Sequence, residues 1–146
     1  MARGQIRTPR YRRTRAELDH RAVDMKPLTL YATGRILFGI AALVAPGTVG
    51  RILAGDGGAE PDAQAFLRGM GGREIGLGLG LLAMIRDNGP VKPWLVAALL
   101  ADSSDIAGIA GVWPNMVPSK RLLGLGTAGG AAVIGAIMLG TLPRET

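Results

Sequence analysis

The chain has 146 residues, enough for one domain, of which 48% are hydrophobic and only 4% aromatic. It contains no cysteine, which excludes disulfides, thiolate metal sites and a cysteine nucleophile. The formal net charge of +6 is concentrated at one end, because residues 1–26 hold eight Lys/Arg against three acids while the remainder holds nine against eight. The basic character therefore belongs to a tail and does not describe the domain.

The first segment, residues 1–27, is this basic tail. Its stretch "RTPRYRRTR" carries one aromatic side chain and has no folded platform beside it, whereas nucleic-acid-binding modules combine basic groups with a recognisable fold. Basic residues before a first span are typical of a cytoplasmic flank that orients the span and contacts anionic lipid. We therefore predict a disordered cytoplasmic tail that binds membrane lipid and no nucleic acid.

Four apolar segments follow the tail, at about residues 28–45, 63–85, 93–113 and 121–142. Each is close to the ~20 residues that a helix needs to cross the hydrocarbon core, and none alternates as a strand would. The stretches between them are rich in Gly, Pro and charged residues, which predicts loops. The sequence thus predicts an all-α fold, a four-helix transmembrane bundle over residues 28–142, followed by a short tail, 143–146. A soluble helical domain with buried glycine-rich helices is the alternative.

The charges between the spans predict which side of the membrane each loop faces. The N-terminal tail, residues 86–92 and the C-terminal "PRET" carry cations and fall on one side of a four-span bundle. The other side holds three cations and three acids, which balance: Arg51, Lys120, Arg121, Asp56, Glu60 and Asp62. Lys120 and Arg121 run against this orientation unless they extend to the membrane surface. Because cytoplasmic loops carry the excess of Lys and Arg, we expect both termini in the cytoplasm. The Gly- and Ala-rich composition is typical of a GC-rich bacterial genome, so we expect the bacterial inner membrane.

Six charged residues lie inside the predicted spans, although a charge at the centre of a membrane helix costs roughly 2.5–3.5 kcal/mol on insertion scales. They are three arginines and three acids: Arg35, Arg68, Arg73, Glu74, Asp102 and Asp105. Because their charges sum to zero, we predict one buried polar network between the helices. Matching their depths along antiparallel helices gives two expected ion pairs, Arg73–Asp102 and Arg68–Asp105. Because Arg68 and Arg73 lie about 140° apart around the helix, one of them can point to another neighbour instead. Arg35, from the inner half of the first span, is expected to reach Glu74.

Two interpretations of this network stay open. The charges can serve only to fix which helices pair and in what register, or they can line a site for a proton, an ion or a polar headgroup. A magnesium site on Glu74, Asp102 and Asp105 is a further alternative, but the neighbouring arginines compete for the same oxygens. We predict no metal and no cofactor. We also predict no catalytic residue, because the single histidine lies in the tail, far from any serine of the spans.

Glycines recur every four residues in two of the spans. Gly72, Gly76 and Gly80 do so in the second span, and Gly126 and Gly130 do so in the fourth. Stripes of small residues let membrane helices approach closely. We predict that these five glycines pack helices together, either within one bundle or between copies in a homo-oligomer.

The first two spans share a pattern, "GRILFGIAALVA" at 34–45 and "GREIGLGLGLLA" at 72–83. The pattern is either a relic repeat or convergent composition. In both cases Arg35 aligns with Arg73, which suggests that the two arginines serve one place in the structure.

Four motifs follow one another along the chain: Arg35 and Gly39 four residues apart, then "APGTVGRILAG", "LRGMGGREIGLGLGLL" and "LLADSSDIAGIAG". Together they resemble a family of small four-helix bacterial membrane proteins that is defined only as a domain of unknown function, and the resemblance covers about residues 30–140. In that family an arginine- and glycine-bearing segment precedes an aspartate-bearing third helix. The matching positions are Arg68, Gly71, Arg73, Glu74 and Gly78. The resemblance implies the fold and a membrane location but no activity, and a looser similarity to DoxX-like membrane proteins implies an accessory role in a redox- or quinone-linked complex.

These observations lead to three functional hypotheses. The first is a non-enzymatic integral membrane protein that acts as an accessory or assembly subunit, with a larger membrane complex or a second copy as its partner. The second is a small transporter or a lipid- or quinone-binding protein that uses the charges at the midplane. The third is a membrane enzyme with an acidic metal site.

Overall fold

The structure, a computed structural model, describes the backbone of residues 15–142 and the side chains of residues 25–142. Over this range the chain is helical and contains no strand, which confirms the predicted all-α class. The elements are α1 (Arg15–Val44), α2 (Pro46–Ala54), η1 (Asp56–Ala59), α3 (Pro61–Arg86), α4 (Lys92–Val112), η2 (Trp113–Asn115) and α5 (Pro118–Thr141). Of these, η1 and η2 are short 3-10 helices.

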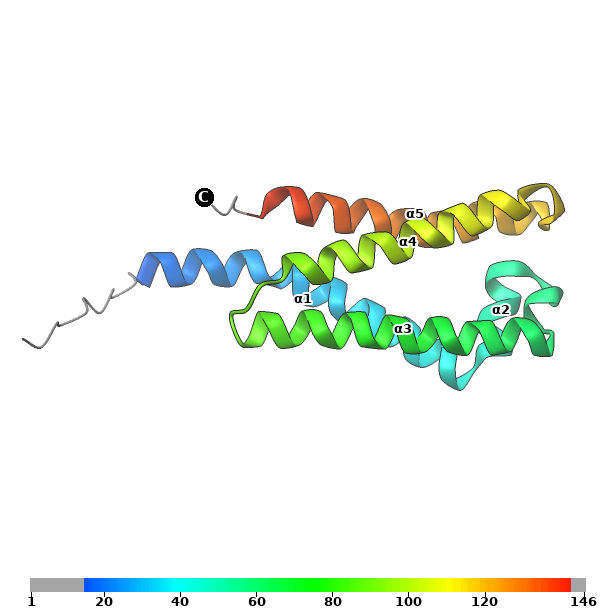
Figure 1. Ribbon diagram of the computed structural model, residues 1–146, viewed down its shortest axis with the longest axis horizontal. Coiled ribbons are helices and arrows are strands. Elements are labelled where there is room, and N and C mark those ends of the chain that lie inside the picture. Colours follow the sequence, from blue (N-terminus) through cyan, green and yellow to red (C-terminus); the bar gives the residue numbers. More distant parts are fainter. Residues whose placement is uncertain (1–14, 143–146) are drawn as a thin grey trace, which may run out of the picture.

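The long helices α1, α3, α4 and α5 run side by side in an elongated bundle (Figure 1). α1 packs along α3, and α4 packs along α5, with the helices of each pair running in opposite directions. The two pairs meet mainly where α3 contacts α4 and where α2 contacts α5. The bundle is therefore built from two helix pairs that are consecutive in the chain.

Three helical segments are long and apolar enough to cross a membrane. They are Met25–Val44, Lys92–Asn115 and Pro118–Thr141, with 20, 24 and 24 residues. α3 has 26 residues and the necessary length, but Arg68, Arg73 and Glu74 interrupt its apolar run. The four predicted spans match the observed helices to within about three residues at each end, except that α1 begins earlier.

The N-terminal helix is longer than the sequence predicts. α1 begins at Arg15, so the predicted disordered tail is wrong for residues 15–27; residues 1–14 and 143–146 lie outside the described range. The stretch "RAELDHRAVDM" is rich in Ala, Leu, Glu and Arg, which are strong helix formers and explain the extension. Pro27 lies inside the helix and removes one backbone hydrogen bond there.

The predicted loop at 46–62 is largely helical, because it contains α2 and η1. Pro46 stands in the first turn of α2, where its missing N–H costs little. Gly55 joins the two elements with a φ of 85°, in the left-handed region that favours glycine. Gly50 of α2 and Gly58 of η1 pack backbone against backbone, so a Cβ on either would overlap the other's main chain. The segment forms a compact cap at the end of the bundle where α4 turns into α5 (Figure 1).

The contact between α1 and α3 depends on three other glycines. A Cβ on Gly39 would lie 2.5 Å from the carbonyl oxygen of Gly71, and one on Gly71 would lie 2.7 Å from that of Gly39. A Cβ on Gly78 would lie 2.6 Å from the carbonyl oxygen of Ala32. Real Cβ atoms essentially never come this close to another heavy atom. Only glycine at these positions lets the two helices pack with their backbones in contact.

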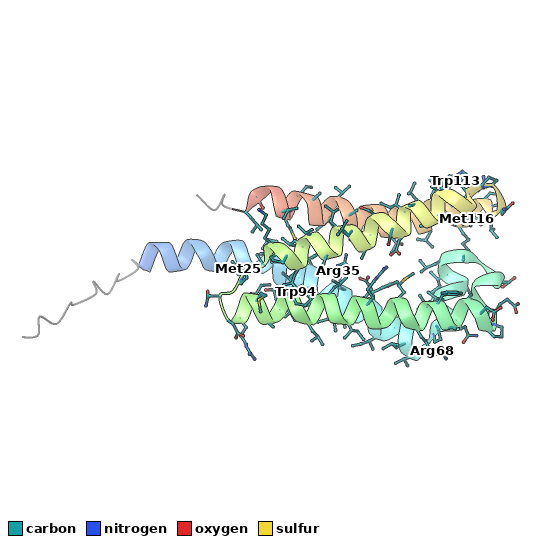
Figure 2. The ribbon with its side chains drawn as sticks, in the orientation of Figure 1. Met25, Arg35, Arg68, Trp94, Trp113 and Met116 are labelled. Atoms are coloured by element: carbon teal, nitrogen blue, oxygen red, sulfur yellow. The ribbon has the colours of Figure 1, made fainter. Side chains whose placement is uncertain are left out.

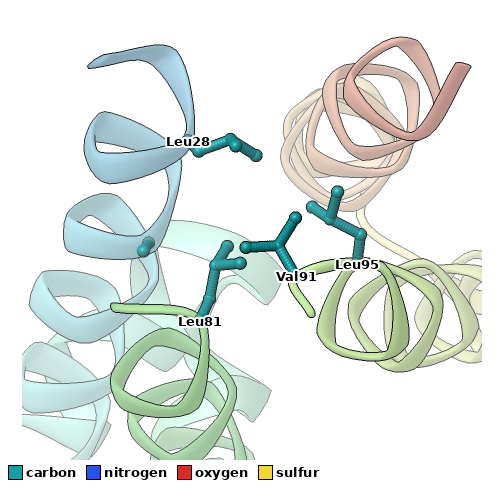
Figure 3. Packing of buried hydrophobic residues seen from close by; sticks show 5 residues of the cluster. Leu28, Leu81, Val91 and Leu95 are labelled. Atoms are coloured by element: carbon teal, nitrogen blue, oxygen red, sulfur yellow. The ribbon is translucent and has the colours of Figure 1, made fainter. Parts of the chain in front are cut away.

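A small aliphatic core closes the end of the bundle opposite the cap (Figure 3). Its buried members come from α1, α3, α4 and the loop before α4: Leu28, Ala32, Leu81, Val91 and Leu95. Met25, Trp94 and Met138 pack against this cluster. Met138 belongs to α5, so all four long helices meet at this end.

Candidate functional site

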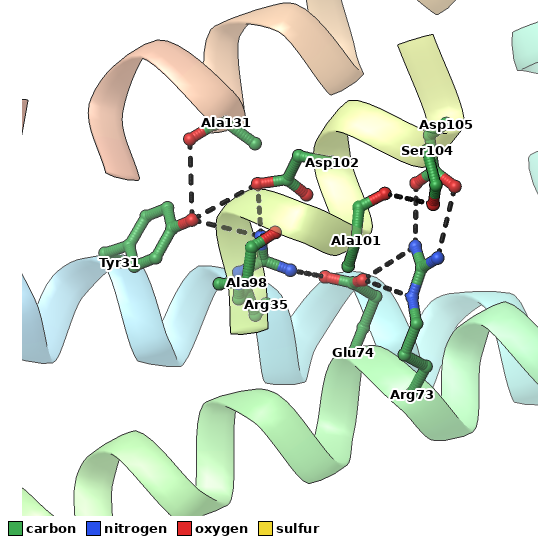
Figure 4. A network of polar contacts seen from close by, with 10 residues as sticks. All are labelled: Tyr31, Arg35, Arg73, Glu74, Ala98, Ala101, Asp102, Ser104, Asp105 and Ala131. Carbon is green, nitrogen blue, oxygen red and sulfur yellow. Dashed lines mark hydrogen bonds and ion pairs between the residues drawn. The ribbon is translucent and has the colours of Figure 1, made fainter. Parts of the chain in front are cut away.

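Arg35 is the centre of a charged network in the middle of the bundle (Figure 4). Its guanidinium donates from Nη1 to Glu74 of α3 and from Nη2 to Asp102 of α4. Nη2 also lies 3.4 Å from the carbonyl oxygen of Ala98. The three charged side chains are buried, with between 5% and 7% of their surface exposed. A single arginine of α1 thereby links three helices.

Tyr31 extends the network to the fourth long helix. It lies one turn before Arg35 on α1, and its hydroxyl oxygen accepts a hydrogen bond from Arg35 Nη2 at 3.0 Å. The same hydroxyl lies within donating distance of Asp102 Oδ2, at 3.3 Å, and of the carbonyl oxygen of Ala131 on α5, at 3.4 Å. The guanidinium also lies 5.0 Å from the centre of the ring, which is a cation–π geometry. Sequence reasoning missed Tyr31, although the i,i+4 spacing places it on the same helix face as Arg35.

Arg73 forms the other half of the network. It binds Asp105 of α4 through two hydrogen bonds, Nη1 to Oδ1 at 3.1 Å and Nη2 to Oδ2 at 2.7 Å. It also donates from Nε and Nη2 to Glu74 Oε1, at 3.2 and 3.0 Å. Glu74 is therefore shared by Arg35 and Arg73, the two arginines that align in the sequence. Arg73 and Asp105 are less buried than the rest, with 33% and 25% of their side chains exposed.

The charges form a continuous chain across the bundle, in the order Asp102, Arg35, Glu74, Arg73, Asp105. Glu74 and Asp102 lie near the middle of α3 and α4, and Arg35 lies near the middle of the apolar part of α1. Five of the six predicted network residues are thus brought together, and Arg35 meets Glu74 as expected. The predicted pair of Arg73 with Asp102 is wrong. Arg35 occupies Asp102, and Arg73 binds Asp105 instead.

Arg68 lies outside the network, which corrects the sixth prediction. Its side chain is exposed on the face of α3 that is turned away from α4 and α5 (Figure 2). It makes no ion pair with any residue of the described part of the chain, so the predicted pair with Asp105 is wrong. The reason is helical geometry. Arg68 and Arg73 are five residues apart, about 140° around the helix, so they cannot both face α4.

The glycine stripe predicted on α3 lies on the wrong face. Gly72 and Gly76 are exposed, and a Cβ on either would meet no atom within 4 Å. Gly80 does pack closely, because the indole of Trp94 lies against it. Since Glu74 faces inward, the buried face of α3 consists of residues three, four or seven positions away from it. These residues are Leu67, Gly71, Gly78 and Leu81.

Gly126 and Gly130 of α5 also differ from the prediction, because they make no close helix contact. A Cβ on either would meet no atom within 4 Å. Both glycines line a cavity between the two helix pairs. They leave space open, whereas the prediction assigned them to helix packing.

The cavity has a volume of about 870 Å³ and receives residues from all four long helices and from the cap. Most of its wall is apolar, as the larger lining side chains show: Phe38, Leu53, Phe66, Met70, Ile109 and Ile134. The charged network supplies the polar part, through Arg35, Glu74, Asp102 and Asp105. Leu30 and Phe66 line the cavity and yet are 75% and 81% exposed. The cavity therefore opens sideways, through the flank of the bundle.

The three carboxylates of the network are held by arginines. Among the described residues, no group of three acidic, histidine or cysteine side chains is placed to hold a metal ion. Glu74 directs both of its oxygens to arginines, and Asp105 does the same. The arrangement thus gives no support to a magnesium centre on these residues.

The resemblance to small four-helix membrane proteins of unknown function stays a prediction. The function is therefore inferred from the geometry of the site. In comparisons with known proteins, no family model, no curated protein and no solved structure matches this chain.

Proposed function

We propose that the protein is a four-helix integral membrane protein whose interior cavity binds a hydrophobic molecule with a polar group, of the lipid or quinone class. The main support for this proposal is the cavity, which is lined mostly by apolar residues and in one part by the charged network. Its volume of about 870 Å³ lies in the range of small-molecule sites, about 300–1,000 Å³. Such sites combine apolar walls with a few placed polar groups that orient the ligand.

The fourth span in this proposal is α3. Its central charges face the other helices, where Glu74 meets Arg35 and Arg73 meets Asp105. Charged residues inside membrane proteins commonly face the bundle interior or a cavity and pair with one another. A polar centre of this kind is compatible with lipid around the outside of α3, because the outward positions beside Glu74 are Gly72 and Gly76. The exposed Arg68 lies about two turns from the start of α3 at Pro61, where a long side chain can reach the membrane surface.

Access from the bilayer follows from the same geometry. Leu30 of α1 and Ile134 of α5 line the cavity, and they are 75% and 47% exposed. An apolar opening on the flank of a membrane helix bundle faces lipid tails. A hydrophobic ligand can therefore enter sideways without crossing water.

The proposed membrane is the bacterial inner membrane, with both termini in the cytoplasm. Arg86 and Lys92 flank the α3–α4 loop, at the same end of the bundle as the start of the apolar part of α1 and the end of α5. Arg86 Nε donates a hydrogen bond to Asp87 Oδ1 at 2.9 Å, and an arginine stays protonated at physiological pH. Cations in short loops favour the cytoplasmic side.

Cysteine labelling tests this topology, because the chain has no cysteine of its own. We expect Gly57→Cys, in the cap, to react with a membrane-impermeant maleimide in intact spheroplasts. Thr141→Cys, at the opposite end, should react only after detergent lysis. Both positions are exposed. Reaction of Thr141→Cys alone in intact cells contradicts the orientation, and equal reaction of both contradicts a bundle that spans the membrane.

Filling the cavity tests ligand binding. We expect Gly130→Leu to remove the co-purifying lipid or quinone while the protein stays folded, since an added side chain there enters open space. Native mass spectrometry of the protein released from detergent measures the bound molecule. Gly108→Leu is the matched control, because Gly108 also has no atom within 4 Å of an added Cβ but does not line the cavity. Retention of the same ligand by Gly130→Leu contradicts the proposal.

The role of an accessory or assembly subunit stays a prediction. Affinity purification in mild detergent, with mass spectrometry of the captured proteins, tests it directly.

A further inference from the structure

We infer that the molecule bound in the cavity is an amphiphile with a single cationic head, and that the head lies against Asp102 beside the charged network. This inference rests on the ligand-binding function proposed above. It concerns the sign of the ligand's charge, which the apolar wall alone leaves open.

The first argument is the balance of charge. With Arg68 on the outer face of α3, the network contains two arginines, Arg35 and Arg73, against three carboxylates. It therefore carries one excess negative charge when all five groups are ionised. An uncompensated charge in a low-dielectric interior is unfavourable unless a partner neutralises it. A bound cation supplies that partner.

The second argument is an acceptor that the protein leaves free. Asp102 binds Arg35 and Tyr31 through Oδ2, and its Oδ1 accepts no hydrogen bond from the described residues. The residue is only 3% exposed, and it lies in the wall of the cavity. A buried carboxylate oxygen at a cavity wall is a position for a positively charged group or a hydrogen-bond donor.

The arginines, in contrast, offer an anion little. Arg35 uses both terminal nitrogens on carboxylates, and Arg73 uses all three guanidinium nitrogens on Glu74 and Asp105. Arg35 Nε has no hydrogen-bond partner but is fully buried, and Arg73 does not line the cavity. An anionic head would therefore lie beside guanidinium groups whose charge the carboxylates already compensate.

The rest of the wall specifies the body of the ligand. A small inorganic cation is not favoured, because no three metal-ligating side chains converge among the described residues. Phe38 and Phe66 line the cavity together with aliphatic side chains. Aromatic faces attract cations as well as alkyl groups, so the wall suits a cationic head joined to a hydrocarbon body.

Three photoreactive alkyl probes of equal chain length test the inference, with trimethylammonium, hydroxyl or sulfate heads. Each is cross-linked to the purified full-length protein in the neutral detergent dodecyl maltoside, and the labelled α5 peptides are quantified by mass spectrometry. We expect the trimethylammonium probe to label α5 about tenfold more than the hydroxyl probe, because only its head carries a positive charge that the excess carboxylate attracts.

The outcomes separate the two proposals. Equal labelling by the trimethylammonium and hydroxyl probes, or preferred labelling by the sulfate probe, overturns the inference of a cationic head and leaves the ligand-binding function intact. If no probe labels the cavity residues, or if Gly130→Leu leaves all labelling unchanged, the ligand-binding function itself is overturned.

A pair of variants isolates the charge from the structure. Asp105→Asn leaves two arginines and two carboxylates in the network, so its net charge becomes zero. We expect the labelling by the trimethylammonium probe, relative to the hydroxyl probe, to fall several-fold. Arg73→Gln raises the excess negative charge to two, and we expect the preference to rise. Both variants break the same ion pair, Arg73–Asp105, so a structural disturbance would move both in one direction. A common shift overturns the inference, and hydroxyl-probe labelling reports whether each variant is folded.

Discussion

Arg35→Gln should destabilise the protein by about 3–5 kcal/mol, the usual cost of removing one partner from a buried ion pair. The change leaves Glu74 without one of its two arginines and leaves Asp102 with only the hydroxyl of Tyr31. All three charged groups are more than nine-tenths buried, so water cannot replace the lost hydrogen bonds. Equilibrium unfolding in mixed micelles, followed by circular dichroism, measures the change.

Arg68→Gln is the control, because Arg68 is an exposed arginine that makes no ion pair with the described residues. We expect a change within about 0.5 kcal/mol, as for surface substitutions in general. The double variant Arg35→Gln/Glu74→Gln should lose less stability than the sum of the two single variants, because neighbouring partners are not additive. Equal effects of Arg35→Gln and Arg68→Gln would show that the network contributes nothing to stability.

Gly71→Val should destabilise the α1–α3 contact by about 1–3 kcal/mol or more, whereas Gly72→Val, one residue along, should be close to neutral. A Cβ on Gly71 would lie 2.7 Å from the carbonyl oxygen of Gly39 and 3.1 Å from Cβ of Ala42. Main-chain atoms of a packed helix cannot move aside as the tip of a side chain can. Gly72 is exposed with no atom within 4 Å of an added Cβ.

The comparison of these two variants is informative because both substitute the same residue type in the same helix. Differences in helix propensity and in membrane insertion therefore cancel. The midpoint of thermal unfolding in detergent gives the stability, and cross-linking of a cysteine pair placed on α1 and α3 reports whether the helices separate. If Gly72→Val is the more harmful change, the inward face of α3 is assigned incorrectly.

The helical segments could be predicted because hydropathy and length act locally. The short helix α2 was missed for a local reason too. Pro46 follows the first predicted span directly, and proline between spans predicts a loop, but Pro46 also occupies a favourable first position in a new helix. The close approach of Gly50 and Gly58, which folds the predicted loop into a cap, has no signal in the sequence.

The members of the network could be predicted from charge and depth, but their partners could not. The depth of a charged residue in the bundle follows from its position along the helix. Its ion-pair partner depends also on the direction in which the side chain points around the helix axis. Once Glu74 is placed inward, the same direction identifies Gly71 and Gly78 as the buried glycines and excludes Gly72. The sequence contained this information, and the regular four-residue spacing of the other glycines obscured it.

The cavity is the part of the site that sequence reasoning could not reach. It depends on how far two helix pairs lie apart, which follows from packing over the whole length of the bundle. Gly126 and Gly130 look alike in the sequence whether they admit a neighbouring helix or leave space empty. Only the absence of any atom near them decides between these two roles.

The division of the bundle into two consecutive helix pairs has a consequence for biosynthesis. Chains fold from the N-terminus as they are made, so α1 and α3 are available to each other before α4 and α5 exist. The early pair contributes Arg35, Arg73 and Glu74 to the network, a charge of +1, and the late pair contributes Asp102 and Asp105, a charge of −2. In the proposed membrane protein, the acidic α4 would therefore enter the membrane after the helices that carry its arginines. Because the arginines are synthesised before the aspartates, Asp102 and Asp105 can form their ion pairs as soon as α4 is made.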